Sequence, residues 1–175
     1  ETTVTSEVVS AMSSLLANTP LEDAMQRNFD RLGPPPFDAD DVAFARRMQT
    51  TITPAHIESA FRRSGLPITD FPLCNAIAPK EVPGPRMMGS TDVGDVSWAV
   101  PTVQARGATY TVGTPGHSWQ LTAHGQSPLA HKGMVHVAKV MAGVAVDVLA
   151  EPGLLEQAKA DFQERLIRTP YKALL

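Results

Sequence analysis

The sequence has little cysteine and little aromatic character. Cys74 is the single cysteine, and aromatic residues make up 6% of the 175 positions. One cysteine excludes a disulfide within the chain, which fits a reducing compartment. Two spacings typical of zinc sites, H-E-x-x-H and C-x-x-C, are also missing. Because Cys74 lies in a proline-rich stretch without a nearby histidine, we interpret it as a buried or incidental thiol.

Neither sign of charge is in large excess. The chain has 15 basic and 18 acidic residues, and the basic ones form no stripe, which argues against a nucleic-acid partner. The longest apolar run, residues 133–150, is broken by His136, Lys139 and Asp147, so we expect no membrane partner. The lone thiol and the lack of a leader-like opening favour a cytoplasmic protein.

Hydrophobic residues account for 43% of the chain, and their spacing predicts several helices. Thr19 with Pro20, Asp38, and Thr53 with Pro54 are typical helix starts, and Ser127-Pro128 repeats the signal. The predicted helices cover residues 19–32, 38–48, 53–65, 128–150 and 154–167. The fourth is apolar nearly all round, so we expect it to be central and buried.

Two stretches favour strands. Residues 2–12 carry several β-branched residues but have no neighbour to pair with, and residues 97–113 are also strand-like. Residues 66–89 and 113–128 are expected to be loops. Strands that alternate with buried helices predict an α/β fold.

Histidine is concentrated in one part of the sequence, since four of the five lie between His117 and His136. Histidine is the commonest metal ligand. His117 follows a predicted strand and a glycine-containing turn, a placement that leaves a side chain free at the end of a sheet. A metallohydrolase needs at least three protein ligands for each ion, and the sequence contains no complete set. We therefore expect only part of a metallohydrolase site.

Asp92 and Asp95 lie three residues apart in a glycine-containing segment. Such carboxylates could bind a metal, orient a ligand imidazole, or cap backbone amides of their own loop. The ligand spacing of an EF-hand is absent.

Gly116-His-Ser-Trp-Gln120 offers a second chemistry, because it is similar to the nucleophile elbow G-x-S-x-G with Ser118 at its centre. The last position is Gln120 instead of glycine, and no histidine follows Asp147 to complete a triad. A serine hydrolase stays an alternative.

Three motifs in order carry a family resemblance: Ser90-Thr-Asp-Val-Gly-Asp-Val-Ser-Trp98, Gly113-Thr-Pro-Gly-His-Ser-Trp-Gln120 and Ala130-His-Lys-Gly-Met134. Together they resemble the C-terminal part of members of the aminoacylase/carboxypeptidase-like metallopeptidase family. The resemblance implies a zinc-peptidase-like three-layer αβα catalytic domain with an inserted lid that mediates dimerisation. Residues 1–17 would end the lid/dimerisation domain, and residues 18–175 would form the C-terminal part of the catalytic domain.

The same resemblance implies a bimetal site with Zn or Mn. His117 matches a late metal ligand, while the other ligands and the general-base glutamate would lie in the N-terminal half. Thr91, Asp92, Ser118 and His131 would line or support the site. The implied reaction is hydrolysis of an N-acyl amino acid such as p-aminobenzoyl-glutamate, by a homodimer that could need a companion A-type subunit. The 175 residues would be inactive alone.

A non-catalytic module that kept the fold is the alternative from a different class. Either way, half a domain leaves apolar surface uncovered, so we expect the isolated chain to self-associate or to be poorly ordered near residues 66–89.

Overall fold

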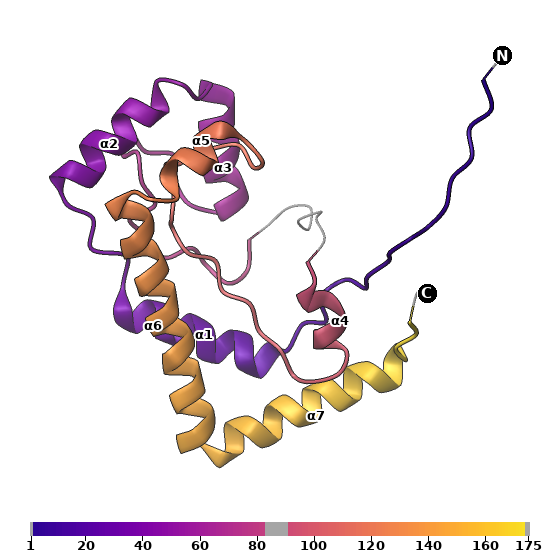
Figure 1. The fold of residues 1–175 in the computed structure, drawn as a ribbon. Helices are drawn as coiled ribbons and strands as arrows, with labels where there is room; N and C mark the ends of the chain where they lie inside the picture. Colours follow the sequence, from indigo (N-terminus) through magenta and orange to yellow (C-terminus); the bar gives the residue numbers. More distant parts are fainter. Residues whose placement is uncertain (1, 83–90, 174–175) are drawn as a thin grey trace.

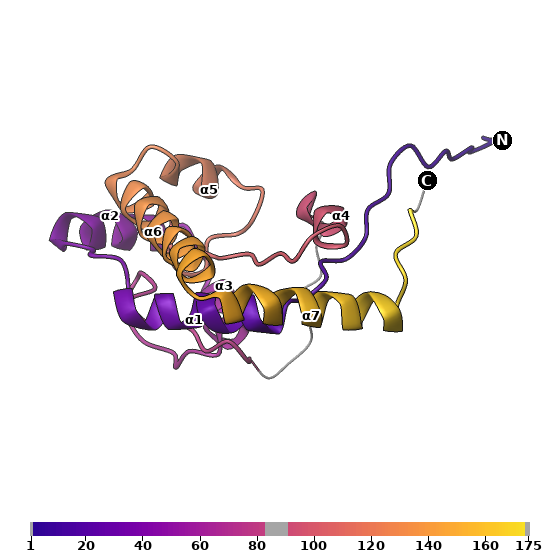
Figure 2. The same cartoon turned by 90° about the horizontal axis from the view of Figure 1, so that it is seen from below.

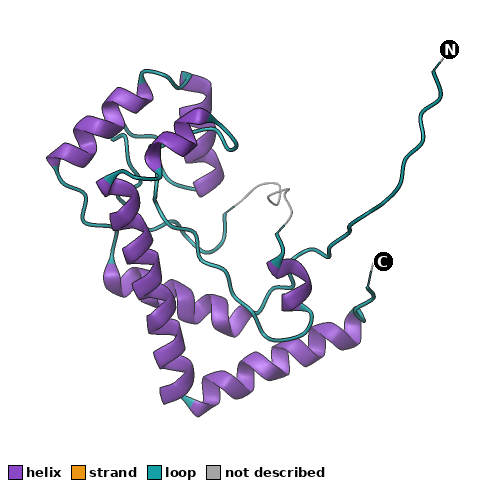
Figure 3. Ribbon diagram, viewed as in Figure 1, coloured by secondary structure: helices purple, strands orange, loops and turns teal. Residues whose placement is uncertain are grey.

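The computed structural model describes residues 2–82 and 91–173, and all regular secondary structure in that part of the chain is helical (Figures 1 and 3). The described residues form seven helices: α1 (Thr19–Leu32), α2 (Ala39–Gln49), α3 (Pro54–Ser64), α4 (Val93–Ser97), α5 (Trp119–His124), α6 (Pro128–Ala150) and α7 (Pro152–Arg168).

The predicted α/β fold is therefore wrong for the described residues, which contain no strand. Residues 2–12 are extended and mostly exposed, and Figure 1 shows them running away from the helices. Residues 98–110 form an irregular connection after α4. β-Branched residues suit an extended backbone, but a strand also needs a neighbour for its hydrogen-bond ladder. Among the described residues, neither segment has a neighbouring strand.

Helix starts are the most predictable local feature. Asp38 caps α2 and forms a reciprocal capping box with Asp41, and Ser127 caps α6 through Ala130 N–H. The cap of α1 lies one residue earlier than predicted, at Asn18, whose Oδ1 accepts from Leu21 N–H at 3.3 Å. The Asn18 amide also donates to the Ala158 carbonyl at 2.8 Å and so ties α1 to α7.

Two short helices were not predicted. α4 occupies the segment expected to be an acidic loop, and α5 interrupts the predicted loop 113–128. Both have six residues or fewer, too short for an amphipathic repeat to be visible in the sequence. The described part of the loop expected at 66–89, residues 66–82, is irregular as predicted, and residues 83–90 lie outside the described residues.

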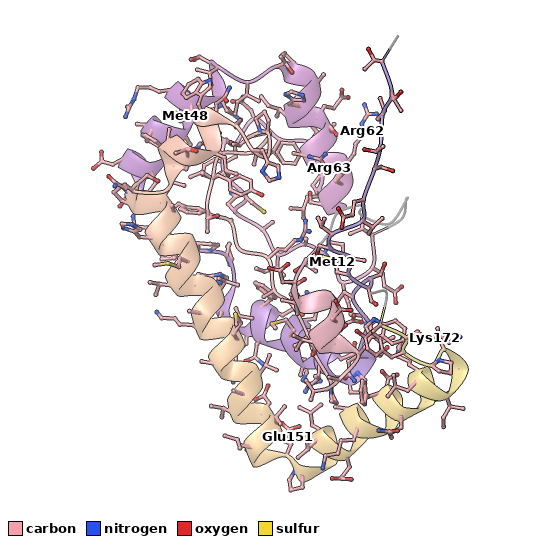
Figure 4. All side chains as sticks on the ribbon, turned by 45° about the vertical axis from the view of Figure 1, so that its right-hand side comes forward. Met12, Met48, Arg62, Arg63, Glu151 and Lys172 are labelled. Carbon is pink, nitrogen blue, oxygen red and sulfur yellow. The ribbon has the colours of Figure 1, made fainter. Side chains whose placement is uncertain are left out.

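The three long helices build the main core. α6 and α7 diverge from a corner at Glu151, and α1 packs against both (Figures 1 and 4). The buried residues of this core are Ala24, Met25, Val140, Val144 and Leu154. A second cluster joins α2 to the start of α6 and contains Ala45, Leu73, Leu129 and Ala130. Figure 2 shows from below that α6 runs obliquely toward the start of α7, with α1 and α7 overlapping in this view.

The expectation that α6 is buried on all sides is wrong. Its inner face packs on α1, α7 and the connection near Ala108, whereas Met134, Val146 and Leu149 are exposed on the other face. In the described ranges α6 is also the one helix long and apolar enough to cross a membrane by length and composition, a test that core helices of soluble proteins pass as well.

Candidate functional site

The loop that carries His117 starts at a position that only glycine fits. Gly113 has φ +90°, and a Cβ added there would lie 2.8 Å from the Ile57 Cα at the start of α3. The following residue, Thr114, is buried, and its hydroxyl donates to the Thr111 carbonyl at 2.7 Å. The loop is thus packed against α3 before it reaches the surface.

His124 closes this loop from its far end. The Thr111 N–H donates to His124 Nε2 at 3.2 Å, and the Thr111 hydroxyl lies 2.8 Å from the same nitrogen. His124 Nδ1–H donates to the Gln120 carbonyl at 2.6 Å. Because Nε2 accepts and Nδ1 donates, the ring is the neutral tautomer with its proton on Nδ1. Burial lowers the pKa of His124, partly opposed by the Gln120 hydrogen bond. His124 is therefore a structural clamp, and no short-range spacing in the sequence pairs it with Thr111.

His117 lies between these two anchors and is exposed. Its φ of +53° makes it the one non-glycine residue with positive φ in the described chain. Positive φ is uncommon for residues with a side chain, and such strain persists where the surroundings enforce it, often at functional sites. Within the described residues the imidazole makes no hydrogen bond, so both ring nitrogens can reach an external group.

Ser118 has a local structural role. Its Oγ accepts from the Leu121 N–H at 3.2 Å and donates to the Pro115 carbonyl at 2.7 Å, and in this way it caps α5. A hydroxyl engaged on both sides gives no support to the nucleophile expected from the elbow-like motif, which also needs a histidine base beside it.

In the third motif, at the start of α6, Lys132 and Gly133 contact other parts of the fold, whereas His131 faces solvent. Lys132 donates to Asp38 and Asp41, each at 2.5 Å, and so joins α6 to α2; these bonds raise its pKa. Gly133 lies against the connection, where an added Cβ would be 2.0 Å from the Ala108 carbonyl oxygen. His131, which precedes Lys132 in the first turn of α6, is exposed. Two of the motif's residues therefore hold the fold, and its histidine faces outward.

The first motif docks α4 onto the start of the chain. Asp95 accepts from the Ser13 N–H and the Tyr171 hydroxyl, both at 3.1 Å, and the Ser13 bond lowers the pKa of Asp95 below its usual value. Gly94 leaves room for the Ser13 carbonyl. Figure 4 shows Met12 and Lys172 on the α4 side of the molecule.

The two motif residues expected near the site are differently engaged. The Thr91 hydroxyl accepts from Gln104 Nε2 at 3.3 Å, whereas Asp92 is exposed just before α4 and caps nothing with its side chain. Neither carboxylate caps an amide of its own loop, which was one of the roles considered: Asp92 caps nothing, and Asp95 accepts from the distant Ser13 N–H. Ser90, the first residue of the motif, lies outside the described residues.

α4 and α5, which Asp92 and His117 precede, lie apart in both Figures 1 and 2. Across residues 2–82 and 91–173, no three His, Cys, Asp or Glu side chains form a group that could hold a metal ion. The described residues therefore hold no complete metal centre of three or more protein ligands.

The structure also contains a cavity of about 400 Å³ away from His117, between α1, residues 74–80 and residues 103–108. His136 lies in its wall. The His136 Nε2 donates to the Gly33 carbonyl at 2.6 Å, and its buried Nδ1 has no partner in the described structure. Phe29 packs beside the ring, with centroids 6.0 Å apart. This nitrogen is enclosed by protein and does not open a second site by itself.

Comparison with known proteins identifies a relative that covers nearly the whole chain. The match is to the B subunit of p-aminobenzoyl-glutamate hydrolase from Escherichia coli (strain K12), with 34% identity over 182 aligned residues and 98% of this chain. The chain is similar to this hydrolase subunit. The three motifs quoted above pointed to this same relative, and the comparison confirms the resemblance.

The match covers only part of the E. coli protein, because the chain spans 38% of its length. No family model matches the chain, and no solved structure matches it. The comparison thus relates these 175 residues to part of a hydrolase subunit.

Proposed function

We propose that the chain forms part of a metal-dependent amidohydrolase that cleaves p-aminobenzoyl-glutamate or a similar N-acyl amino acid. The observation that carries the proposal is the 34% identity to the E. coli hydrolase subunit over 98% of this chain. The polypeptide that corresponds to the rest of that relative supplies the remaining metal ligands and the general-base glutamate. In this view residues 1–17 end a lid domain, and residues 18–175 belong to the catalytic domain.

His117 is the residue of this chain that we assign to the metal, Zn or Mn. Its exposed imidazole and positive φ support the assignment, as does the packing of its loop against α3. Gly113 and the Thr111–His124 bonds hold the backbone on both sides of His117, and a held backbone favours a ligand position. Because one ligand does not make a centre, we assign no catalytic step to the 175 residues.

A non-catalytic module is the competing function, and one observation favours it. Gly94, Asp95, Lys132 and Gly133 all have structural contacts, which account for much of two motifs without any chemistry. This alternative does not explain why an exposed histidine, His117, has a positive φ.

The experiment replaces the matching stretch of the E. coli hydrolase subunit with these 175 residues and measures bound zinc and p-aminobenzoyl-glutamate hydrolysis. We expect the 175 residues alone to give no turnover and the chimera to give turnover. His117→Ala in the chimera should lower both bound metal and rate at least tenfold, because a ligand to the ion is lost. His56→Ala, at an exposed histidine in the first turn of α3, is the matched control.

Hydrolysis by the isolated chain contradicts the proposal. An unchanged metal content and rate in His117→Ala favours the non-catalytic module.

A further inference from the structure

The outer face of α6 is apolar and has no partner in the described structure. Five large apolar side chains on it are at least 48% exposed: Met134, Val135, Met141, Val146 and Leu149. Ala138, Ala142 and Ala145 lie exposed among them. At 3.6 residues per turn these eight residues share one arc of roughly half the helix circumference. The opposite arc contains the buried residues Ala130, Gly133, His136, Val140 and Val144.

This arc, called the outer face below, has almost no charge. Lys139 lies at its edge and His131 at its N-terminal end, and it contains no acidic residue. Water is a poor environment for a continuous apolar strip of this kind, and a helix that is apolar all round is normally enclosed by other protein. The described residues cover only the inner face of α6.

We propose that the outer face of α6 is the surface on which the remainder of a hydrolase of the E. coli relative's length packs. This inference rests on the proposed function and adds the place of contact. The length of the relative supports this occupant, because well over half of it lies outside the match. The exposed methionines and branched aliphatic side chains are of the apolar kind that fills the buried core of protein interfaces.

The inner contacts of α6 favour a protein occupant over a lipid bilayer. Asn28 of α1 donates to Asp147 of α6 at 2.6 Å, and His136 donates to the Gly33 carbonyl. These bonds hold α6 against α1, which exposes Arg27 and Arg31. Insertion of α6 into lipid would take those charged side chains with it at a high cost in free energy.

The test compares one substitution in two contexts. Ala142 on the outer face and Ala160 on α7 are both exposed helical alanines, so Ala142→Glu and Ala160→Glu form a matched pair. In the isolated 175-residue chain we expect both variants to unfold at the wild-type midpoint. In the chimera with the E. coli hydrolase subunit, Ala142→Glu should lower the melting temperature by about 5 °C or more, because it buries a charge, and Ala160→Glu should leave it unchanged.

Other results overturn the inference. These are an Ala142→Glu chimera as stable as wild type, an equal loss for Ala160→Glu, or a wild-type chimera that shows no cooperative unfolding. A discrete dimer of the isolated chain that Ala142→Glu dissociates, with the chimera unaffected, assigns the face to a second copy. Binding of the isolated chain to phosphatidylcholine vesicles that Ala142→Glu abolishes, again with the chimera unaffected, assigns it to a membrane.

The hydrolysis assay separates this inference from the proposed function. If the Ala142→Glu chimera is destabilised while His117→Ala retains full metal content and rate, the contact surface stands and the metal assignment fails. If His117→Ala loses metal while Ala142→Glu leaves the stability of the chimera unchanged, the metal assignment stands and the contact surface fails.

Discussion

Four histidines lie within twenty residues of one another, and the fold separates them into two kinds. His124 and His136 are 1% and 6% exposed, and each donates a ring proton to a backbone carbonyl. His117 and His131 are exposed, and their rings make no hydrogen bond within the described residues. In the sequence all four are candidate ligands of the same residue type.

The difference shows that residue type sets what a histidine can do, and its surroundings set what it does. A buried ring has only protein groups to bond, so His124 joins Thr111 to Gln120. In the same way His136 joins α6 to Gly33, although the Nδ1 of His136 has no partner among the described residues. An exposed ring on a constrained loop keeps its lone pair for an external group. The clamp at His124 and the exposed ring at His117 belong to the same loop, so the first holds the second in place.

The largest expected effect on stability comes from removing the clamp. His124→Ala loses the bonds to Thr111 and Gln120 and the edge contact with Phe44, whose ring centroid lies 5.5 Å away. We expect a loss of about 2–4 kcal/mol in the free energy of unfolding. His131→Ala, at an exposed ring, should stay within about 0.5 kcal/mol of wild type. Urea unfolding of the 175-residue chain measures both, and equal losses would show that the two histidines do not differ in this way.

A smaller effect is expected where the loop begins. Gly113→Ala places a Cβ against the Ile57 backbone at a residue with φ +90°, and we expect it to cost about 1–3 kcal/mol. An added Cβ at Gly116 meets nothing within 4 Å, so Gly116→Ala is the matched control and should be close to neutral. Thermal unfolding with the same two proteins tests this, and a neutral Gly113→Ala would mean that the loop is not held against α3.

The smallest effect is a dependence of stability on pH. Burial lowers the pKa of His124 below its ordinary value of 6.5, so the unfolded chain binds its proton at a higher pH than the folded chain. The contribution is fully present above pH 6.5 and is lost as pH falls from there through the lowered pKa of the folded state. Asp38 and Asp95 have pKa values lowered from 3.8, so their contributions are lost in a more acidic window.

We therefore expect the free energy of unfolding to decline as pH falls below about 6.5, as measured by urea titration at several pH values. His124→Gln should reduce this decline, and His117→Ala and His131→Ala should keep it. A decline that disappears with either exposed histidine would contradict the assignment.

Local signals made part of the fold predictable. Asp38, Thr53 and Ser127 cap their helices as the sequence indicated, and Gly33 and Gly65 end theirs with positive φ. These features depend on a few neighbouring residues, so a single sequence reveals them. The glycine-containing turn before His117 was predicted, but the strand and sheet end expected there are not among the described residues. The comparison confirms the resemblance to a hydrolase subunit.

Features that depend on distant partners were not predictable. The strand-like residues 97–113 did not form a strand, because an extended segment needs a neighbour that the sequence cannot supply. The roles of Asp95 and His124 come from bonds to Ser13 and Thr111, and no spacing rule links either pair. The burial of α6 on one side only depends on which elements pack against it.

By itself the sequence determined the approximate bounds of the five longer helices, the resemblance to a hydrolase and the stretch where histidines gather, because each follows from residues close together in the chain. Only the tertiary structure decided which histidines are enclosed and which remain available, and which half of α6 is left uncovered. Burial and hydrogen bonding are set by contacts between segments far apart in sequence, and those contacts exist only once the chain has folded.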